Sequence, residues 1–348
     1  MSIKVGIIGL GKMGKLHLRV SRYMDDARVV AVADPSPRAL RAAQKEGVRT
    51  VYEDYHELLQ DPSVDAVIIT LPNFLHLEVA LAAVAAGKHV FVEKPLAMTS
   101  ADCERIDDAA ARQGVKLMVG HNYRFFDATR RLKADYDSGA IGDVVLSTLE
   151  LVHGPLAPSL ESLPVPEWYF ERDKVGMWLL DLGYHVADLF RWLFGDAEVV
   201  YARLDNHYGF PYEDNAIVVL QSQAGPKGVL HVGYFAKLVF PAFDFRVILH
   251  GTAGCLSTDQ LVPRNLRLHA AREGMANMLR RITFRRVKPL SYTYFYSSYV
   301  EEQRHFFDCL RNGKEPAVGA RDAFGTIRLL EDVYRYCDGV RSVSAMAS

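Results

Sequence analysis

The sequence contains little cysteine: its 348 residues include four, and no two of them form a Cys-x-x-Cys pair. Cys103, Cys255, Cys309 and Cys337 are far apart along the chain, which argues against a disulfide framework or a zinc cluster. The chain also enters an apolar run directly after Lys4, so we expect no signal peptide. Because sparse cysteine is typical of a reducing compartment, we expect a cytoplasmic protein.

Long apolar runs are also missing. The most apolar long stretch, residues 66–87, is interrupted by Pro72, Asn73, His76 and Glu78. A membrane-spanning helix needs about 20 consecutive apolar residues, so we expect no membrane span. The formal net charge is −1, so nucleic acid or an acidic membrane is not indicated as the main partner of the whole chain.

The remaining composition is that of an ordinary globular protein. Apolar residues make up 49% of the chain and charged residues 24%, which excludes a disordered chain. At roughly 100–200 residues per domain, a chain of 348 residues predicts two domains.

Up to about residue 121 the chain alternates strand-like and helix-like segments. Short apolar runs are separated by segments with helical periodicity, which predicts a parallel sheet covered by helices on both faces. The expected strands are Val5–Ile8, Val29–Val32, Ala66–Thr70, His89–Val92 and Lys116–Val119, and the expected helices are Gly14–Tyr23, Pro37–Glu46, Leu77–Ala86 and Ala101–Arg112.

After about residue 122 the pattern changes to strand-like runs rich in β-branched and aromatic residues, some separated by turn signals such as Ala224-Gly225-Pro226. These runs predict a mainly antiparallel sheet. We therefore divide the chain into domains 1–121 and 122–348, and we expect the helix at 321–338 to pack back toward the first domain. The expected strands are Val144–His153, Val199–Leu204, Ala216–Gln221, Gly228–Phe235 and Phe245–Gly251, and the expected helices are Ala128–Ser138, Gly176–Phe194, Tyr299–Arg311 and Arg321–Asp338.

A glycine-rich turn follows the first strand. Gly9, Gly11 and Gly14, with Lys12 and Met13 between them, fit the pattern GxGxxG between a strand and a helix. The first glycine permits a tight turn, the second lets the backbone approach a pyrophosphate, and the third lets the helix lie close to the strand. The free N–H groups at the helix N-terminus would then face the phosphates of a dinucleotide.

Asp34 ends the second strand, 20 residues after Gly14. A carboxylate there can accept hydrogen bonds from both adenosine ribose hydroxyls and would repel a 2′-phosphate, so NAD is favoured over NADP. Arg38 lies close enough to moderate that repulsion, and Pro35 follows the carboxylate directly. The alternative is a structural Asp that caps a helix or a turn.

A polar segment follows the third strand. It contains Thr70, Leu71, Pro72, Asn73 and His76. Since the C-termini of parallel strands face the ligand crevice, we expect this segment to contact the cofactor through ribose or nicotinamide. A plain loop that caps the next helix is the alternative.

Glu93, Lys94 and Pro95 follow the fourth strand at the same edge of the sheet. Pro95 restricts the backbone of the residue before it, so Lys94 is held in a defined direction beside the expected cofactor. Lys94 could donate a proton to a substrate carbonyl. A solvated surface lysine is the alternative.

The strongest signal in the second domain is a polar stripe in an apolar segment. Asp181, His185 and Asp188 are spaced at i, i+4 and i+7, which places them on one helical face. Imidazole ordinarily titrates near pH 6.5, so His185 could accept and return a proton, and Asp181 could orient it or bind hydroxyls. The alternatives are satisfied core polar groups and a metal site, and we expect no metal because the sequence supplies no companion cluster of ligands.

Together these motifs resemble the Gfo/Idh/MocA family, named after glucose–fructose oxidoreductase and inositol dehydrogenase. The resemblance rests on residues 9–14, Asp34, 70–76, 93–96, 122–125 and 176–188. It implies a Rossmann domain with a doubly wound parallel sheet, followed by an α+β domain with a large, mainly antiparallel open sheet. It also implies homodimers or homotetramers formed through that second sheet.

The resemblance assigns further roles to individual residues. It implies that Lys94 is the catalytic lysine, and that Asp181 and His185 are the acid and the histidine of the second-domain motif. It places Asn122 and Trp168 near the cofactor, and Tyr123 and Arg124 near the nicotinamide or the substrate. One departure stands out: the family often has glycines before the acidic helix, whereas this chain has Gly176-Met177-Trp178, which would narrow the substrate pocket.

The function that these residues indicate is an NAD-dependent oxidoreductase acting on a secondary hydroxyl or ketone of a sugar, a cyclitol or a sugar derivative. In this hypothesis His185 takes the hydroxyl proton, Lys94 stabilises the alkoxide, and Asp181 positions the substrate. Three alternatives stay open: a nucleotide-sugar dehydrogenase, a redox-neutral enzyme that recycles NAD, and a non-catalytic NAD-binding regulator.

A basic segment near residue 280 lies outside these motifs. Met275, Met278, Leu279 and Ile282 are spaced at i, i+3, i+4 and i+7, as in a short amphipathic helix. Either this is a solvated excursion from the sheet, or it contacts an anionic substrate or a membrane surface. The basic residues of the cluster are Arg272, Arg280, Arg281, Arg285, Arg286 and Lys288.

Overall fold

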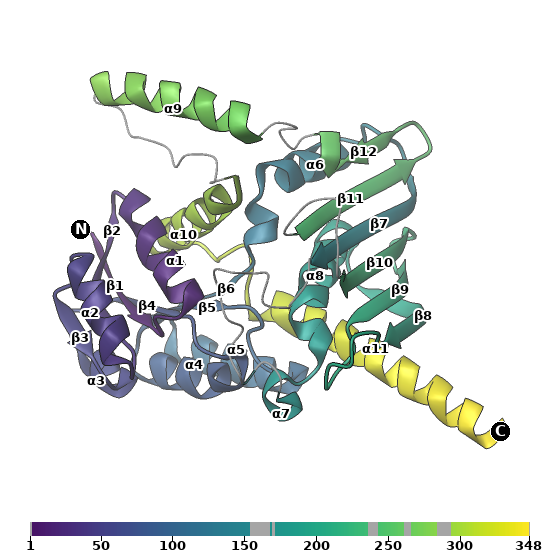
Figure 1. Ribbon diagram of the computed structural model, residues 1–348, viewed down its shortest axis with the longest axis horizontal. Helices are drawn as coiled ribbons and strands as arrows, with labels where there is room; N and C mark the ends of the chain where they lie inside the picture. Colours follow the sequence, from purple (N-terminus) through teal and green to yellow (C-terminus); the bar gives the residue numbers. More distant parts are fainter. Residues whose placement is uncertain are drawn as a thin grey trace. The chain divides into compact units, whose positions relative to one another are not determined.

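The computed structural model (Figure 1) describes residues 2–153, 168, 171–235, 243–260, 266–283 and 294–347. The chain forms two compact units, each made of separate stretches of sequence. Unit 1 contains Met1–Leu96, Glu104–Asp127 and Val262–Ala320, and unit 2 contains Ala97–Cys103, Ala128–Leu261 and Arg321–Ser348. The division into domains 1–121 and 122–348 stays a prediction. None of the described helices is long and apolar enough to cross a membrane.

Unit 1 is built on a six-stranded parallel sheet in the order β3-β2-β1-β4-β5-β6, which is the doubly wound order expected for a Rossmann fold. Its central strands β4 and β5 are almost completely buried because helices cover both faces. The strands are β1 (Ile3–Ile8), β2 (Ala27–Ala33), β3 (Thr50–Tyr52), β4 (Ala66–Ile69), β5 (His89–Glu93) and β6 (Leu117–Gly120).

The four helices predicted between residues 14 and 112 agree with α1, α2, α4 and α5 to within three residues, whereas α10 starts five residues before its predicted start. Ser36 caps α2 by accepting a hydrogen bond from the Ala39 N–H, and Pro37 occupies the first helical position, where it needs no donor. The helices are α1 (Lys12–Val20), η1 (Ser21–Tyr23), α2 (Pro37–Lys45), α3 (Tyr55–Gln60), η2 (Asn73–Leu75), α4 (His76–Ala85), α5 (Ser100–Gln113), η3 (Asn122–Phe125), α9 (Leu266–Ile282) and α10 (Tyr294–Asn312).

Strand β3 and helix α3 were missed in the sequence analysis. β3 has three residues and α3 has six, so neither is long enough to show a clear period. A local signal was present: Asp54 accepts a hydrogen bond from the His56 N–H at the start of α3, and Glu57 stands three residues later. Aspartate followed by glutamate at this spacing marks a helix N-terminus.

Unit 2 contains a six-stranded mixed sheet in the order β12-β11-β7-β10-β9-β8. Among the strands that the structure describes in this sheet, only β7 and β10 pair in parallel, so the prediction of a mainly antiparallel sheet is confirmed. Gly225, with a φ of +115°, forms the turn between β9 and β10 that the sequence indicated. The strands are β7 (Val144–His153), β8 (Ala197–Asp205), β9 (Asn215–Ser222), β10 (Lys227–Tyr234), β11 (Phe243–Gly251) and the unpredicted β12 (Cys255–Ser257).

Helix α8 (Leu182–Phe194) packs on β7 and β10, and most of its residues are buried (Figure 1). Gly228 of β10 lets the helix approach, because a Cβ there would overlap the ring of Phe190. Helix α11 (Ala320–Ala347) is tied to α8, since Arg191 donates a hydrogen bond of 3.0 Å to the Asp322 carbonyl oxygen. The other helices are α6 (Asp127–Asp137), α7 (Arg172–Val175), η5 (Trp178–Leu180) and η6 (Thr258–Gln260).

The predicted helix Gly176–Phe194 starts too early. Gly176 has a φ of +68°, Trp178–Leu180 form a separate 3₁₀ turn, and the α-helix begins only at Leu182. The left-handed backbone of Gly176 is incompatible with a helix interior, which is why the regular helix starts later. The prediction that residues 321–338 pack toward the first domain stays a prediction.

Candidate active site

The glycine turn at the end of β1 has an open cradle. Gly9 has a φ of +89°, and a Cβ on Gly14 would overlap the Gly9 carbonyl oxygen, so both positions require glycine. Gly11 differs: a Cβ there would have no atom within 4 Å. The glycine at position 11 is therefore not explained by packing, and it leaves room for a group to approach the backbone.

Helix α1 begins at this cradle, and no side-chain cap is formed at its N-terminus. Gly11 is its N-cap and has no side chain to accept a hydrogen bond from the first N–H groups of the helix. Lys12 is exposed and Met13 is half-buried at the first helical positions. These features fit a pyrophosphate, which is bound by free N–H groups and by the positive end of the helix dipole.

Asp34 connects the second strand to this turn. One carboxylate oxygen accepts a hydrogen bond of 2.6 Å from the Leu10 N–H, and the other accepts one of 2.8 Å from the Ser36 N–H. Each oxygen retains a further lone pair that a ribose hydroxyl can use. Asp34 thus stabilises the turn at Pro35, which was the structural alternative to a cofactor role. It can still bind a ribose at the same time. Pro35 and Arg38 beside it are exposed.

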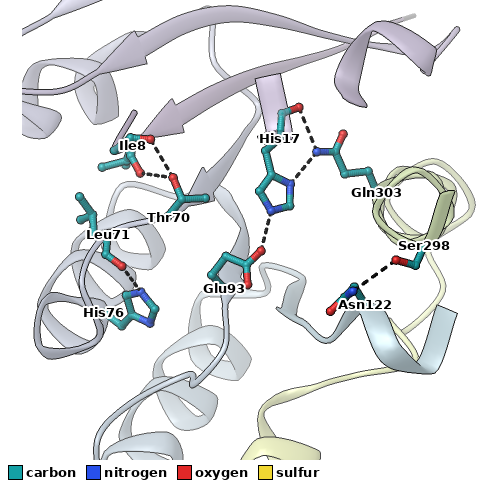
Figure 2. Close-up of polar contacts among 10 residues, drawn as sticks. Ile8, His17, Thr70, Leu71, His76, Glu93, Asn122, Ser298 and Gln303 are labelled. Atoms are coloured by element: carbon teal, nitrogen blue, oxygen red, sulfur yellow. Dashed lines mark hydrogen bonds and ion pairs between the residues drawn. The ribbon is translucent and has the colours of Figure 1, made fainter. Parts of the chain in front are cut away.

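The segment after β4 is fixed to the glycine turn by a side chain. Figure 2 shows the Thr70 hydroxyl at the end of β4, where it lies 2.7 Å from the Gly9 carbonyl oxygen and 3.2 Å from that of Ile8. This buried hydroxyl therefore links the end of β4 to the end of β1. Leu71, Pro72 and Asn73 follow and are partly exposed, so they can contact a cofactor.

His76 connects this segment to the Lys94 turn. Its ring is completely buried, with Nδ1 2.6 Å from the Pro95 carbonyl oxygen and Nε2 2.8 Å from that of Leu71. Burial lowers the pKa of His76, although the two carbonyl oxygens favour the protonated ring. The burial effect is the larger, so the neutral ring donates to one carbonyl at a time. These contacts give His76 a positioning role, and its direct contact with a cofactor stays a prediction.

Glu93 ends β5 in a buried hydrogen-bonded chain (Figure 2). His17 Nε2 of α1 lies 2.7 Å from Glu93 Oε1, and Gln303 Nε2 of α10 lies 2.7 Å from His17 Nδ1. Gln303 Nε2 also donates to the His17 carbonyl oxygen at 3.2 Å, which fixes the orientation of the amide because a carbonyl only accepts. Nδ1 is therefore an acceptor, and the proton on Nε2 is donated to Glu93. Lys94, the next residue, is partly exposed.

Two further acidic groups of α10 lie in the same buried region. Burial and the negative charge of Glu93 raise the pKa of the completely buried Glu302 well above its ordinary value. Burial likewise raises the pKa of Tyr299, which contacts the His17 ring edge-on. Both groups therefore resist ionisation in this buried region.

Residues 122–124 form a buried 3₁₀ turn in unit 1. Asn122 Nδ2 donates a 3.3 Å hydrogen bond to Ser298 Oγ of α10, and Arg124 Nη1 lies 3.3 Å from the Ala317 carbonyl oxygen. Asn122, Tyr123 and Arg124 have exposures of 4–5%. The turn is thus well anchored, while the predicted contacts of these three residues with nicotinamide or substrate stay predictions.

In unit 2, Asp181 stands at the N-cap of α8 without capping it. Its carboxylate instead accepts a hydrogen bond of 3.1 Å from the Tyr234 hydroxyl of β10. Burial, together with the charge of Asp181, raises the pKa of Tyr212. A carboxylate held beside tyrosine hydroxyls in this way can bind substrate hydroxyl groups.

His185 lies one turn further along α8 and is 8% exposed, so the helix brings it to the same face as Asp181. Asp188, the third member of the predicted stripe, is completely buried and accepts a hydrogen bond from the Thr326 hydroxyl of α11. For Asp188 the interpretation as a satisfied core group is therefore correct. Among the described residues, no three metal-ligating side chains are grouped to hold an ion.

Of the two bulky residues before α8, Trp178 belongs to the core of unit 2 and Met177 is partly exposed. Trp178 is completely buried, and its ring centroid lies 5.7 Å from that of Tyr234. It therefore supports the tyrosine that binds Asp181. Trp168 is partly exposed, and its carbonyl oxygen accepts a hydrogen bond from the Glu171 N–H.

Sequence reasoning missed His17, Gln303, Tyr299 and Glu302. A signal existed for His17, because it shares the buried face of α1 with Gly14 and Leu18. No signal existed for Gln303, which contacts His17 across 286 positions of sequence.

Comparisons with known proteins cover both units. Residues 3–121 match the model of an oxidoreductase family with an NAD-binding Rossmann fold, and residues 129–257 match a GFO/IDH/MocA C-terminal domain. The chain is 29% identical over 332 residues to myo-inositol 2-dehydrogenase of Thermotoga maritima, covering 92% of each chain. It is 31% identical to inositol 2-dehydrogenase of Burkholderia cenocepacia, covering 93% of this chain and 90% of the relative. The crystal structure of a probable dehydrogenase from Thermotoga maritima superposes with a TM-score of 0.78 at 26% identity, covering 96% of this chain and 97% of that one.

Proposed function

Because the chain belongs to the Gfo/Idh/MocA family of NAD-binding oxidoreductases, we propose that it is a dehydrogenase of an inositol or a closely similar cyclitol. Its general chemistry is that of the family: hydride transfer between NAD and a secondary hydroxyl or ketone of a sugar-like compound. The observation that carries the cyclitol assignment is that both inositol dehydrogenase relatives match the substrate domain as well as the Rossmann domain.

The residues present fit NAD as the cofactor. Gly11 and the uncapped start of α1 would hold the pyrophosphate, and Asp34 would hold the adenosine ribose and disfavour a 2′-phosphate. When bound, NAD supplies a nicotinamide C4 that accepts the hydride. Residues 70–73, which the Thr70 hydroxyl fixes to the glycine turn, would form one side of the same site.

The proposed mechanism assigns three roles to side chains. His185 takes the proton of the reacting hydroxyl, since an imidazole can accept and return a proton near neutrality. Lys94 stabilises the negative charge that develops on the same oxygen. Asp181, held by Tyr234, binds a neighbouring hydroxyl and orients the ring of the cyclitol. Tyr123 and Arg124 are proposed to contact the substrate, and Asn122 and Trp168 the cofactor.

A panel of substrates tests the proposal. The purified chain would be assayed by NADH absorbance with myo-inositol, scyllo-inositol, aldoses, sugar acids and nucleotide sugars, each with NAD and with NADP. We expect the highest kcat/KM for a cyclitol with NAD. Three results would contradict this proposal. A higher kcat/KM for a nucleotide sugar would indicate a nucleotide-sugar dehydrogenase, and product without net NADH would indicate a redox-neutral enzyme that recycles NAD. NAD binding without any turnover would indicate a non-catalytic regulator.

We further propose that the protein is cytoplasmic and that the outer face of the unit 2 sheet joins copies of the chain. Leu149 and Val218 point into the core, whereas Leu146, Tyr201 and Ile217 on the other face are 39–45% exposed. Apolar side chains gathered on one open sheet face are typical of an interface between subunits. Light scattering should therefore give the mass of a dimer or a tetramer, and the mass of a monomer would contradict this.

A further inference from the structure

Helix α9 carries its apolar side chains on the solvent side. Met275, Met278, Leu279 and Ile282 are 60–67% exposed, and their spacing places them in one stripe along the helix. A helix at the surface of a globular protein normally buries such a stripe. The orientation of α9 is therefore the reverse of the usual one.

The opposite face of α9 carries polar side chains that are hydrogen-bonded to one another. Arg280 Nη1 donates hydrogen bonds to Asn277 Oδ1 at 2.8 Å and to Glu273 Oε2 at 3.0 Å. Asn277, with 6% exposure, is the one fully buried residue among those of α9 whose side chains the structure describes. Rotating the helix to cover its apolar stripe would bring the charged side chains of Glu273 and Arg280 toward solvent and expose the buried Asn277, so the observed orientation buries the polar network in place of the stripe.

The charge of this segment differs sharply from that of the rest of the chain. Residues 266–288 contain seven arginines and lysines against one glutamate, a net charge of +6, although the whole chain has −1. Arg272 and Arg281 are exposed and stand at the two edges of the apolar stripe. An apolar stripe with a cation on each edge is the pattern of a helix that lies in the plane of a membrane surface.

We propose that α9 is a peripheral docking surface for an anionic lipid bilayer. The four apolar side chains enter the boundary between headgroups and acyl chains, and Arg272 and Arg281 bind lipid phosphates at its edges. A small anionic ligand would use the arginines but leave the apolar stripe in water. A second copy of α9, related by a two-fold axis, would bring two segments of charge +6 together, which like-charge repulsion opposes.

Sedimentation with vesicles tests the proposal. The full chain would be mixed with phosphatidylcholine vesicles that contain or lack phosphatidylglycerol. We expect binding only to the anionic vesicles, with an affinity that falls as salt is raised. Absence of binding to anionic vesicles at low salt would overturn the proposal.

Paired variants separate the apolar and the charged contributions. Met278→Asp with Leu279→Asp should weaken partitioning by more than about tenfold, whereas Met278→Leu with Leu279→Met should leave it unchanged because the apolar area is kept. Arg272→Gln with Arg281→Gln should weaken it by about 25-fold, at roughly fivefold for each charge near the surface. The matched control is Arg19→Gln with Arg112→Gln, which removes the same charge from two exposed side chains elsewhere.

The same variants distinguish a bilayer from the other occupants. All four should retain the melting temperature and the NAD affinity of the parent chain, because none of these residues lies in the dinucleotide site. A solution mass that falls in the Met278→Asp, Leu279→Asp variant would assign the stripe to a second copy of the chain. Equal partitioning of that variant and the parent would show that the stripe does not enter the bilayer, and either result would overturn the proposal.

Discussion

His17 Nε2 donates a hydrogen bond of 2.7 Å to Glu93 Oε1, in a region where the His17 ring has no exposure to solvent. Glu93 immediately precedes Lys94, so this bond fixes the backbone from which the catalytic lysine is proposed to project. Gln303 fixes the tautomer of His17 from the other side. Helices α1 and α10 thus both contribute to the position of Lys94 without supplying a reacting group.

We predict that His17→Ala lowers kcat by about 10- to 100-fold, because a small displacement of a catalytic group is enough to reduce the rate by such a factor. The KM for NAD should change little, since the glycine turn is held separately by Thr70 and Asp34. Steady-state kinetics with varied NAD would measure both constants. His17→Gln, which keeps a donor toward Glu93, should recover part of kcat, and equal losses in the two variants would contradict a positioning role.

Glu302 makes the stability of unit 1 depend on pH in a defined direction. Its folded-state pKa is raised, so the folded protein holds a proton there that the unfolded chain releases above its ordinary value near 4.5. The stabilisation that this bound proton contributes is fully present below pH 4.5. It declines as the pH rises toward the raised pKa of the folded state. A carboxylate that resists ionisation in the folded state therefore destabilises the protein at alkaline pH.

We expect Glu302→Gln to remove this dependence, because the amide keeps the size of the side chain and has no proton to lose. The variant should have a higher melting temperature than the parent at pH 8, and the difference should shrink toward pH 5. Calorimetry over this range would measure it. Glu301→Gln is the matched control, since the Glu301 side chain is 37% exposed and pairs with Arg304; a similar effect in both variants would contradict the assignment to Glu302.

The sequence predicted the parts of this structure that depend on local pattern. The roles of Gly9, Gly11 and Gly14 follow from spacing alone, and the backbone angle of Gly9 and the close packing of Gly14 agree with them. The predicted start of α8 was wrong because the apolar periodicity of the sequence continues through Trp178. The left-handed backbone of Gly176, which prevents the helix from starting there, depends on surroundings that the sequence does not show. The contact between His17 and Gln303 was beyond local pattern, because it depends on how distant helices pack on the sheet.

The open cradle at Gly11 predicts a variant that folds but binds NAD poorly. A Cβ at Gly11 meets no protein atom within 4 Å, so Gly11→Val should retain the melting temperature of the parent without ligand. The valine would occupy the space that the pyrophosphate needs, and losing one hydrogen bond to a charged group costs about 1.5–3 kcal/mol, or roughly 10- to 100-fold in Kd. Calorimetric titration with NAD would measure the loss. Gly319→Val adds the same side chain at another open position and should bind NAD normally; a normal Kd for Gly11→Val would contradict the phosphate site.

The two proposed proton-handling residues, one in each unit, give the most direct test of the mechanism. Lys94→Ala and His185→Ala should each lower kcat by about 10²-fold or more, because each removes a group that acts on the reacting oxygen. Asp188→Asn is the informative comparison for His185: it changes the same helix, but Asp188 is buried against Thr326, so stability should fall while kcat is largely kept. Lys116→Ala, which removes a surface lysine paired with Glu315, is the comparison for Lys94. Since Gly11 and Asp34, which would hold the pyrophosphate and the ribose, are unchanged in all four variants, each should still show a thermal shift with NAD. Parental kcat in either Lys94→Ala or His185→Ala would refute the role assigned to that residue while leaving the dinucleotide site intact.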